Sequence, residues 1–436
     1  MRPNPAPLKA IGILLYSLLL IFTSAALSAD TSAKASHAAH GSARAKAAHS
    51  SRAAHAAKAA RVNRSARTAT VATRTKISSR RRSRFAYDFG PDPAKDDITT
   101  YDDPVVRSVA VDALGREKGS VLAVDPASGR ILTIVNQKMA FNAALEPCST
   151  IKPFVAIAGL EEGVITRDTM IQVKRHRYMS LTEAMAHSNN EYFQNVGSQL
   201  GFDRVIHYDH MLGLGQHVGY DIPEEQPGSL PSSPPIFGGV ARMSSFGEGI
   251  RMTPFQLASL VTTLANGGTQ YYLQYPRSTE DQASFEPRVR QELDFATVLP
   301  DLREGLLAAV MYGTARQSFD PDGEQALGKT GTCNDENLGG RLGWFASYAD
   351  QAHPKIVLVV LLHGGSRVIS GPHASEIAGK IYRGLYSRNY FTELDRKREQ
   401  LEASLRAEGP AASASSSGAA ALAPVSIGAA SNSQSQ

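Results

Sequence analysis

Residues 146–154 read Glu-Pro-Cys-Ser-Thr-Ile-Lys-Pro-Phe and place Ser149 three positions before Lys152. The apolar run from Phe154 to Leu160 predicts a buried helix. Pro153 fits its first turn, where a missing N–H costs little. Residues three apart share one face of a helix, so we expect the Lys152 amine to reach the Ser149 hydroxyl. A hydroxyl beside an amine at the positive end of a helix suits an activated nucleophile.

This serine–lysine pattern is not specific by itself. A chain of 436 residues contains roughly two such patterns by chance at average residue usage. The alternative interpretation is a serine that caps a helix and a lysine that points into solvent. Two later segments decide against that alternative.

The second segment is His187-Ser188-Asn189-Asn190, which interrupts a helical pattern between Leu181 and Leu200. It contains Ser188 and Asn190, two positions apart.

The third segment is Lys329-Thr330-Gly331-Thr332 on the predicted strand 327–332. Alternation along a strand sends Thr330 and Thr332 to one face. Gly331 lets another backbone approach closely, and Lys329 is expected to supply a fixed positive charge. Such a strand edge could bind an extended anionic peptide. The alternative is an edge strand with a solvated lysine.

The three segments occur together and in this order, and the chain thereby resembles the penicillin-binding transpeptidases and the related serine β-lactamases. The resemblance covers about residues 105–390. It includes the predicted hairpin at 121–134, the segment 253–268 and the strand at Trp344-Phe345-Ala346. Its specificity therefore rests on more than three short motifs.

The resemblance implies a role for each catalytic residue. Ser149 would attack the D-Ala-D-Ala carbonyl and form an acyl-enzyme. Lys152 would take the hydroxyl proton as a neutral amine, which burial and the charge on Lys329 both favour. Ser188 would pass the proton to the leaving amine. The backbone N–H groups of Ser149 and Thr332 would form the oxyanion hole.

The resemblance also implies the binding residues and the ligands. Asn190 would hydrogen-bond to the substrate amide. Lys329, Thr330, Gly331 and Thr332 would hold the terminal carboxylate. The expected partners are peptidoglycan stem peptides and β-lactams, and no metal or organic cofactor is implied.

Both cysteines of the chain adjoin these motifs. Cys148 stands where the family usually has glycine, and Cys333 directly follows the third motif. In the family's geometry the two positions lie side by side, and some class A carbapenem-hydrolysing β-lactamases carry the same pair. We expect a disulfide if the body is exported to an oxidising compartment. The alternative is two free buried thiols.

Three functions remain open at this point. The first is a D,D-transpeptidase or D,D-carboxypeptidase, favoured by the segment 253–268. The second is a serine β-lactamase, which the cysteine pair favours but which needs a deacylating base that no segment clearly supplies. The third is a non-catalytic β-lactam sensor.

The expected fold is α+β, with helices packed on an antiparallel sheet of about five strands. The runs that predict strands are 119–124, 131–135, 327–332, 343–348 and 356–362. The runs that predict helices are 181–200 with its interruption, an amphipathic 253–266, 302–312, and 374–386, which 394–407 extends.

Composition predicts the domain boundaries. Residues 1–29 read as a signal peptide or signal anchor. Residues 30–104 read as a basic, disordered linker and lead-in, with fourteen Lys and Arg against one Asp between residues 30 and 85. The catalytic body is expected at 105–390, starting near Val105. A C-terminal helix at 391–407 and a disordered tail at 408–436 follow.

An export signal places the body in the extracytoplasmic part of the bacterial cell envelope, anchored in the inner membrane if the signal is kept. Behind that signal the run Arg80-Arg81-Arg82 loses its force as a nucleic-acid patch, and no nucleic-acid partner is expected. The basic linker would be a solvated spacer, or would touch anionic lipid or wall polymer.

Overall fold

A computed structural model describes residues 92–408 except for 324, 336 and 350–352. The expected signal segment, most of the basic linker and nearly all of the tail lie outside the described residues. Within the described part, no helix is both long enough and apolar enough to cross a bilayer.

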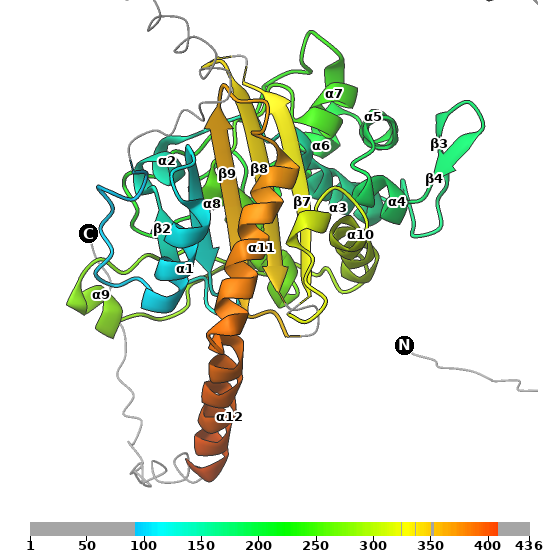
Figure 1. The fold of residues 1–436 in the computed structure, drawn as a ribbon. Coiled ribbons are helices and arrows are strands. Elements are labelled where there is room, and N and C mark those ends of the chain that lie inside the picture. The colour runs from blue at the N-terminus through cyan, green and yellow to red at the C-terminus, as the bar shows by residue number, and fades with distance from the viewer. Residues whose placement is uncertain (1–91, 324, 336, 350–352, 409–436) are drawn as a thin grey trace, which may run out of the picture. The chain divides into compact units, whose positions relative to one another are not determined.

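A five-stranded antiparallel sheet forms the centre of the body, with the strand order β2-β1-β9-β8-β7 (Figure 1). The strands are β1 (Gly119–Val124), β2 (Ile131–Val135), β7 (Ala326–Asn334), β8 (Arg341–Ala349) and β9 (Ile356–Gly364). All five predicted strands are present, and the last three are antiparallel neighbours, as expected. The predicted fold class is confirmed.

Both faces of this sheet are buried under other elements, and the central strand β9 therefore contributes side chains to two hydrophobic cores. Val357, Val359 and Leu361 of β9 belong to one hydrophobic core, whereas Leu358 and Val360 belong to the other. Alternate side chains of a strand point to opposite faces. The unbroken apolar run of β9 is therefore what a strand buried on both faces requires.

Helices form two layers around the sheet. Helices α1 (Pro104–Leu114) and α11 (Gly371–Ser387) cover one face, and α8 (Pro254–Asn266) lies against the other (Figure 1). The 3₁₀ turn η1 (Cys148–Ile151) and helix α3 (Lys152–Glu161) pack beside α8 in the same core.

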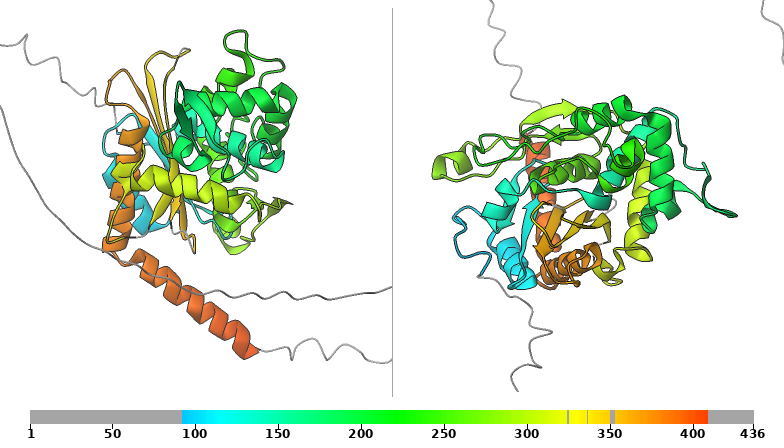
Figure 2. Two further views of the ribbon diagram at one scale, coloured as in Figure 1. Left: turned by 90° about the vertical axis from the view of Figure 1, so that its right-hand side faces the viewer. Right: turned by 90° about the horizontal axis from the view of Figure 1, so that it is seen from above.

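The segments between these elements form a largely helical lobe beside the sheet (Figure 2). Its helices are α4 (Leu181–Ala186), α5 (Asn190–Leu200), α6 (Phe202–Met211), α7 (Gly239–Phe246) and α10 (Leu299–Met311). The remaining short helices are α2 (Gln137–Asn142), α9 (Thr279–Ala283) and η2 (Arg316–Ser318). Two small hairpins complete the body: β3 (Ile171–Lys174) pairs with β4 (Arg177–Met179), and β5 (Thr269–Tyr271) pairs with β6 (Val289–Glu292). The sequence did not predict these small hairpins.

The prediction of an amphipathic helix at 253–266 is correct in position and wrong in character. Thr253 caps the helix and forms a capping box with Gln256, as a strong start signal requires. Every residue from Pro254 to Ala265 is buried. The reason is that α8 lies between the sheet on one side and α2 and β5 on the other, so no face of the helix meets solvent.

Helix α12 (Tyr390–Glu408) does not extend α11, contrary to the expectation for 394–407. Asn389 has a left-handed φ of 56° and separates the two helices. The first two turns of α12 pack on the body, through the buried rings of Tyr390 and Phe391, the side chain of Leu394 and an ion pair of Asp395 with Lys355 at 2.9 Å. The turn at residue 389 therefore sends the chain away from the sheet.

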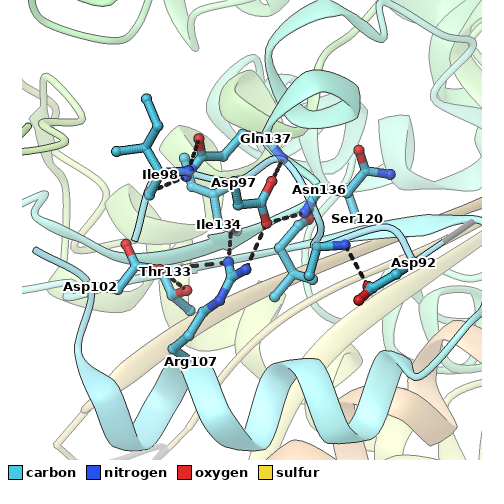
Figure 3. A network of polar contacts seen from close by, with 12 residues as sticks. Asp92, Asp97, Ile98, Asp102, Arg107, Ser120, Thr133, Ile134, Asn136 and Gln137 are labelled. Carbon is cyan, nitrogen blue, oxygen red and sulfur yellow. Dashed lines mark hydrogen bonds and ion pairs between the residues drawn. The ribbon is translucent and has the colours of Figure 1, made fainter. Parts of the chain in front are cut away.

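The packed body starts before residue 105, earlier than expected. Asp97 accepts hydrogen bonds from the Arg107 guanidinium at 2.8 Å and from the backbone N–H groups of Asn136 at 2.9 Å and Gln137 at 2.8 Å (Figure 3). Arg107 also donates to the carbonyl oxygen of Ile134 at 2.6 Å. The lead-in segment is thus hydrogen-bonded to α1 and to the end of β2.

Candidate active site

The nucleophile segment folds as a short 3₁₀ turn that continues into α3. The carbonyl oxygen of Pro147 accepts from the backbone N–H of Thr150 at 3.1 Å and from its hydroxyl at 2.6 Å. The indole N–H of Trp344, on β8, donates to the carbonyl oxygen of Glu146 at 3.0 Å. These bonds fix the turn that holds Ser149 against the sheet.

The Lys152 amine lies at the centre of the cluster. Its Nζ is 3.0 Å from Ser149 Oγ, 3.0 Å from Ser188 Oγ, 2.7 Å from the Ser188 carbonyl oxygen and 2.7 Å from Asn190 Oδ1. The side chain is fully buried. Burial lowers the pKa of Lys152 well below its ordinary value, the charge on Lys329 lowers it further, and Glu191 opposes both.

Ser188 connects the two lysines. It has a left-handed φ of 54° at the turn between α4 and α5. Its Oγ accepts from Lys152 and also from Lys329 Nζ at 2.9 Å. The next residue, Asn189, caps α5 by accepting from the backbone N–H of Tyr192 at 2.8 Å, which holds the turn in place.

Lys329 differs from the expectation of a fixed positive charge. The side chain is 2% exposed and donates to Ser188 Oγ and to the carbonyl oxygen of Thr330, both at 2.9 Å. Burial lowers the pKa of Lys329 to about 7. Its charge therefore titrates near neutral pH, because burial disfavours the charged amine.

Gly331 allows the close backbone approach that the sequence predicted. A Cβ atom there would lie 2.9 Å from the Pro147 carbonyl oxygen and 3.1 Å from Thr150 Cγ2. The turn η1 therefore lies directly against β7. Any side chain larger than hydrogen at residue 331 would push the nucleophile turn away from the strand.

The two threonines of the third motif have partners that the sequence did not reveal. Thr330 Oγ1 and Thr314 Oγ1 are 2.6 Å apart, and Thr332 Oγ1 accepts from the backbone N–H of Gly371 at 2.7 Å. Thr314 follows α10 and Gly371 opens α11. Neither belongs to a motif, and only the spatial neighbourhood of β7 identifies them.

Cys148 and Cys333 form a disulfide, with Cα atoms 5.6 Å apart and a sequence separation of 185 residues. The alternative of two free thiols does not hold in this structure. The bond joins the residue before Ser149 to the residue after Thr332. It therefore covalently ties the nucleophile turn to the strand it faces.

The structure thus brings together residues from three distant segments around one hydroxyl. The buried Lys152 amine, whose pKa is lowered, is positioned to accept the Ser149 proton. The second amine, that of Lys329, is linked to Lys152 through the Ser188 hydroxyl. Within the described ranges, no group of three or more His, Cys, Asp or Glu side chains could hold a metal ion. The arrangement suits acyl transfer through a serine.

The sequence profile of the penicillin binding protein transpeptidase domain matches residues 119–383. The chain belongs to this family. The match begins at β1 and ends within α11, so it spans the whole sheet and the residue cluster around Ser149.

Named relatives are similar at modest identity. Peptidoglycan D,D-transpeptidase MrdA of Haemophilus influenzae is 27% identical over 294 residues, which cover 55% of this chain and 44% of that protein. Stage V sporulation protein D of Bacillus subtilis is 25% identical over 309 residues, covering 62% and 48%. The chain spans about half the length of these relatives.

Solved structures share the fold. The transpeptidase domain of penicillin-binding protein 3 from Burkholderia pseudomallei matches with a TM-score of 0.57 at 19% identity, covering 66% of this chain and 94% of that one. Pseudomonas aeruginosa PBP2 matches with a TM-score of 0.56 at 22% identity, covering 65% and 76%.

Proposed function

We propose that this protein is a penicillin-binding D,D-transpeptidase that cross-links peptidoglycan stem peptides through an acyl-enzyme on Ser149. The observation that carries the proposal is the buried Lys152 amine, 3.0 Å from the Ser149 hydroxyl and lowered in pKa. The lowered pKa increases the fraction of Lys152 that is neutral and able to accept a proton, relative to a solvated lysine.

The reaction follows from these positions. Ser149 Oγ attacks the carbonyl carbon of the penultimate D-alanine while Lys152 takes the hydroxyl proton. The C–N bond to the terminal D-alanine then breaks, and Ser188 passes a proton to the leaving amine. An amine of a second stem peptide attacks the resulting ester, forms the new amide and returns the proton to Ser149.

Substrate binding is assigned to the rim of the same cluster. Asn190 hydrogen-bonds to the substrate amide, and Lys329 with Thr330, Gly331 and Thr332 holds the terminal carboxylate. The carboxylate favours the charged form of Lys329, which burial alone disfavours. The backbone N–H groups of Ser149 and Thr332 stabilise the oxyanion, at about 3 kcal/mol per donor.

The setting proposed for this reaction is the extracytoplasmic side of the bacterial cell envelope. The catalytic domain at 105–390, with the lead-in from residue 97 packed on it, follows the basic linker and, before that, a signal or membrane anchor. The names of the related peptidoglycan D,D-transpeptidases support this setting, and a disulfide beside the nucleophile fits an oxidising compartment.

The disulfide also suits a serine β-lactamase, so that function is the second candidate. A β-lactamase must hydrolyse its acyl-enzyme, which needs a base near the ester. Among the described residues, no carboxylate hydrogen-bonds to Ser149 or Lys152. This observation favours a long-lived acyl-enzyme.

Labelling with fluorescent penicillin tests both candidates. We expect stoichiometric label that persists for many minutes, no label in Ser149→Ala, and normal label in Ser232→Ala, which changes an exposed serine. Loss of label within seconds, with hydrolysed lactam accumulating, would establish a β-lactamase instead. A Ser149→Ala protein that still takes up label would refute both.

A further inference from the structure

A second pocket lies at the opposite edge of the sheet from the candidate active site. It has a volume of about 360 Å³ and is formed by residues around 220, 274–277 and 281–288, which flank α9. Figure 1 shows α9 on the side of β2, whereas α4, β7 and α10 lie on the other side. Its volume falls within the range of small-molecule sites in proteins.

The wall of this pocket at 218–225 is held rigidly. The buried Glu225 carboxylate accepts from the backbone N–H groups of Val218 at 3.0 Å and Gly219 at 2.8 Å. The backbone N–H of Tyr220 donates to the carbonyl oxygen of Leu273 at 2.8 Å. These bonds fix the backbone that carries Tyr220 and leads into Asp221 at the pocket.

The Arg288 guanidinium provides a positive group in the lining of the pocket. The Arg288 guanidinium lies over the Tyr220 ring, 4.1 Å from its centroid. Stacking holds the guanidinium plane but leaves its N–H edge available. Arg288 has no ion pair within the part of the chain that the structure describes, whereas Arg277, also in the pocket, is paired with Glu224 at 2.8 Å.

The same pocket also carries a negative group. Asp221 lines the pocket, is exposed, and has a left-handed φ of 54°. Among the described residues it has neither a hydrogen-bond nor an ion-pair partner for its carboxylate. The other carboxylate of the pocket, Asp281, is already used by the backbone N–H groups of Arg277 and Ser278 at the start of α9.

An unpaired cation and an unpaired anion therefore line one pocket without pairing with each other. We infer that the pocket binds a zwitterion, an amino acid or short peptide whose carboxylate contacts Arg288 and whose ammonium contacts Asp221. A bidentate guanidinium–carboxylate contact gives both strength and orientation. Phe285 and the rings beside it supply apolar surface for the ligand's carbon chain.

The probe is meso-diaminopimelate, in which each of two carbons carries one ammonium and one carboxylate; its choice rests on the proposed function, because stem peptides contain diamino acids. The full chain is first acylated with benzylpenicillin to close the Ser149 site. Binding is then followed by saturation-transfer NMR. We expect saturable binding, weakened about tenfold or more in Arg288→Gln and in Asp221→Asn.

The matched controls are Arg116→Gln and Asp168→Asn, which change exposed residues away from the pocket and should bind like the wild type. The N,N′-diacetyl derivative and the dimethyl ester of the probe should each bind about tenfold more weakly or worse. Absence of saturation with wild-type protein, or equal binding by either pocket variant or either blocked probe, would overturn the inference. Failure of penicillin to acylate Ser149 would instead refute the proposed function.

Discussion

Two residues of the candidate active site hold backbone angles that favour glycine. Cys148 has a φ of 51° and Ser188 a φ of 54°, each at a cost of about 1 kcal/mol. The surroundings maintain them: the disulfide holds Cys148, and the ends of α4 and α5 hold the turn at Ser188. Strained positions of this kind cluster at functional sites, where they fix reacting groups.

The two buried lysines predict a bell-shaped pH profile for acylation by a carboxylate-bearing β-lactam. Lys152 must be neutral, so the second-order rate constant should rise as this residue loses its proton. Lys329 must be charged to bind the carboxylate, and its pKa is about 7. The second-order rate constant reports the protonation state of the free enzyme. Above pH 7 it should therefore fall about tenfold per pH unit, as Lys329 loses its charge. Stopped-flow acylation between pH 5 and 10 measures it.

Lys329→Arg provides the control for this assignment. A guanidinium stays charged throughout that pH range, so the variant should acylate more slowly but lose the alkaline decline near neutral pH. If the rate constant of this variant still falls above neutral pH as in the wild type, the fall is caused by the titration of a group other than Lys329.

At the scale of elements, the site depends on the contact between η1 and β7. Gly331→Ala should disturb it, because the new Cβ would lie 2.9 Å from the carbonyl oxygen of Pro147. We expect a stability loss of about 1–3 kcal/mol from overpacking and acylation at least tenfold slower, since small displacements of reacting groups are costly. Thermal unfolding and labelling rates measure the two effects.

The matched variant is Gly365→Ala, where a Cβ would meet no atom within 4 Å. It should match the wild type in both measurements. Normal acylation by Gly331→Ala would show that the close contact is not needed for the geometry of Ser149.

The disulfide joins the same two elements, and a pair of double variants separates its two effects. Both Cys148→Ala/Cys333→Ala and Cys148→Gly/Cys333→Ala lose the bond, which should cost about 2–5 kcal/mol. The glycine version should be more stable by about 1 kcal/mol, because glycine tolerates the left-handed φ at residue 148. Chemical denaturation measures the difference, and equal stability of the two variants would contradict the strain argument.

The sequence predicted these elements well where local signals decide them. Strands β8 and β9 have largely apolar runs of the right length, and α8 has a capping box and a terminal glycine. The sequence could not predict that α8 is buried all round, because that depends on what packs against it. Thr314 and Gly371 were missed for the same reason, since their only link to the site is spatial.

At the scale of the whole molecule, the cluster joins segments that are far apart in the chain. Strand β7, at one edge of the sheet, contacts η1. Strand β2, at the other edge, is hydrogen-bonded to the lead-in segment through Leu132 and Thr133. The lead-in is fixed through Arg107, whose side chain is only 13% exposed. We infer that folding of the body includes residues 97–103 as a structural part.

A pair of adjacent aspartates tests this inference. Asp97→Ala removes the acceptor of three hydrogen bonds and leaves the mostly buried Arg107 guanidinium with the Ile134 carbonyl oxygen at 2.6 Å and, as its remaining carboxylate among the described residues, Asp102 at 3.6 Å. We expect the free energy of unfolding to fall by about 3 kcal/mol, since removing one partner of a buried pair is costly. Asp96→Ala, which changes an exposed carboxylate, should leave stability unchanged. Calorimetry compares them, with penicillin labelling as a measure of the intact site, and equal unfolding temperatures would exclude the lead-in from the folded body.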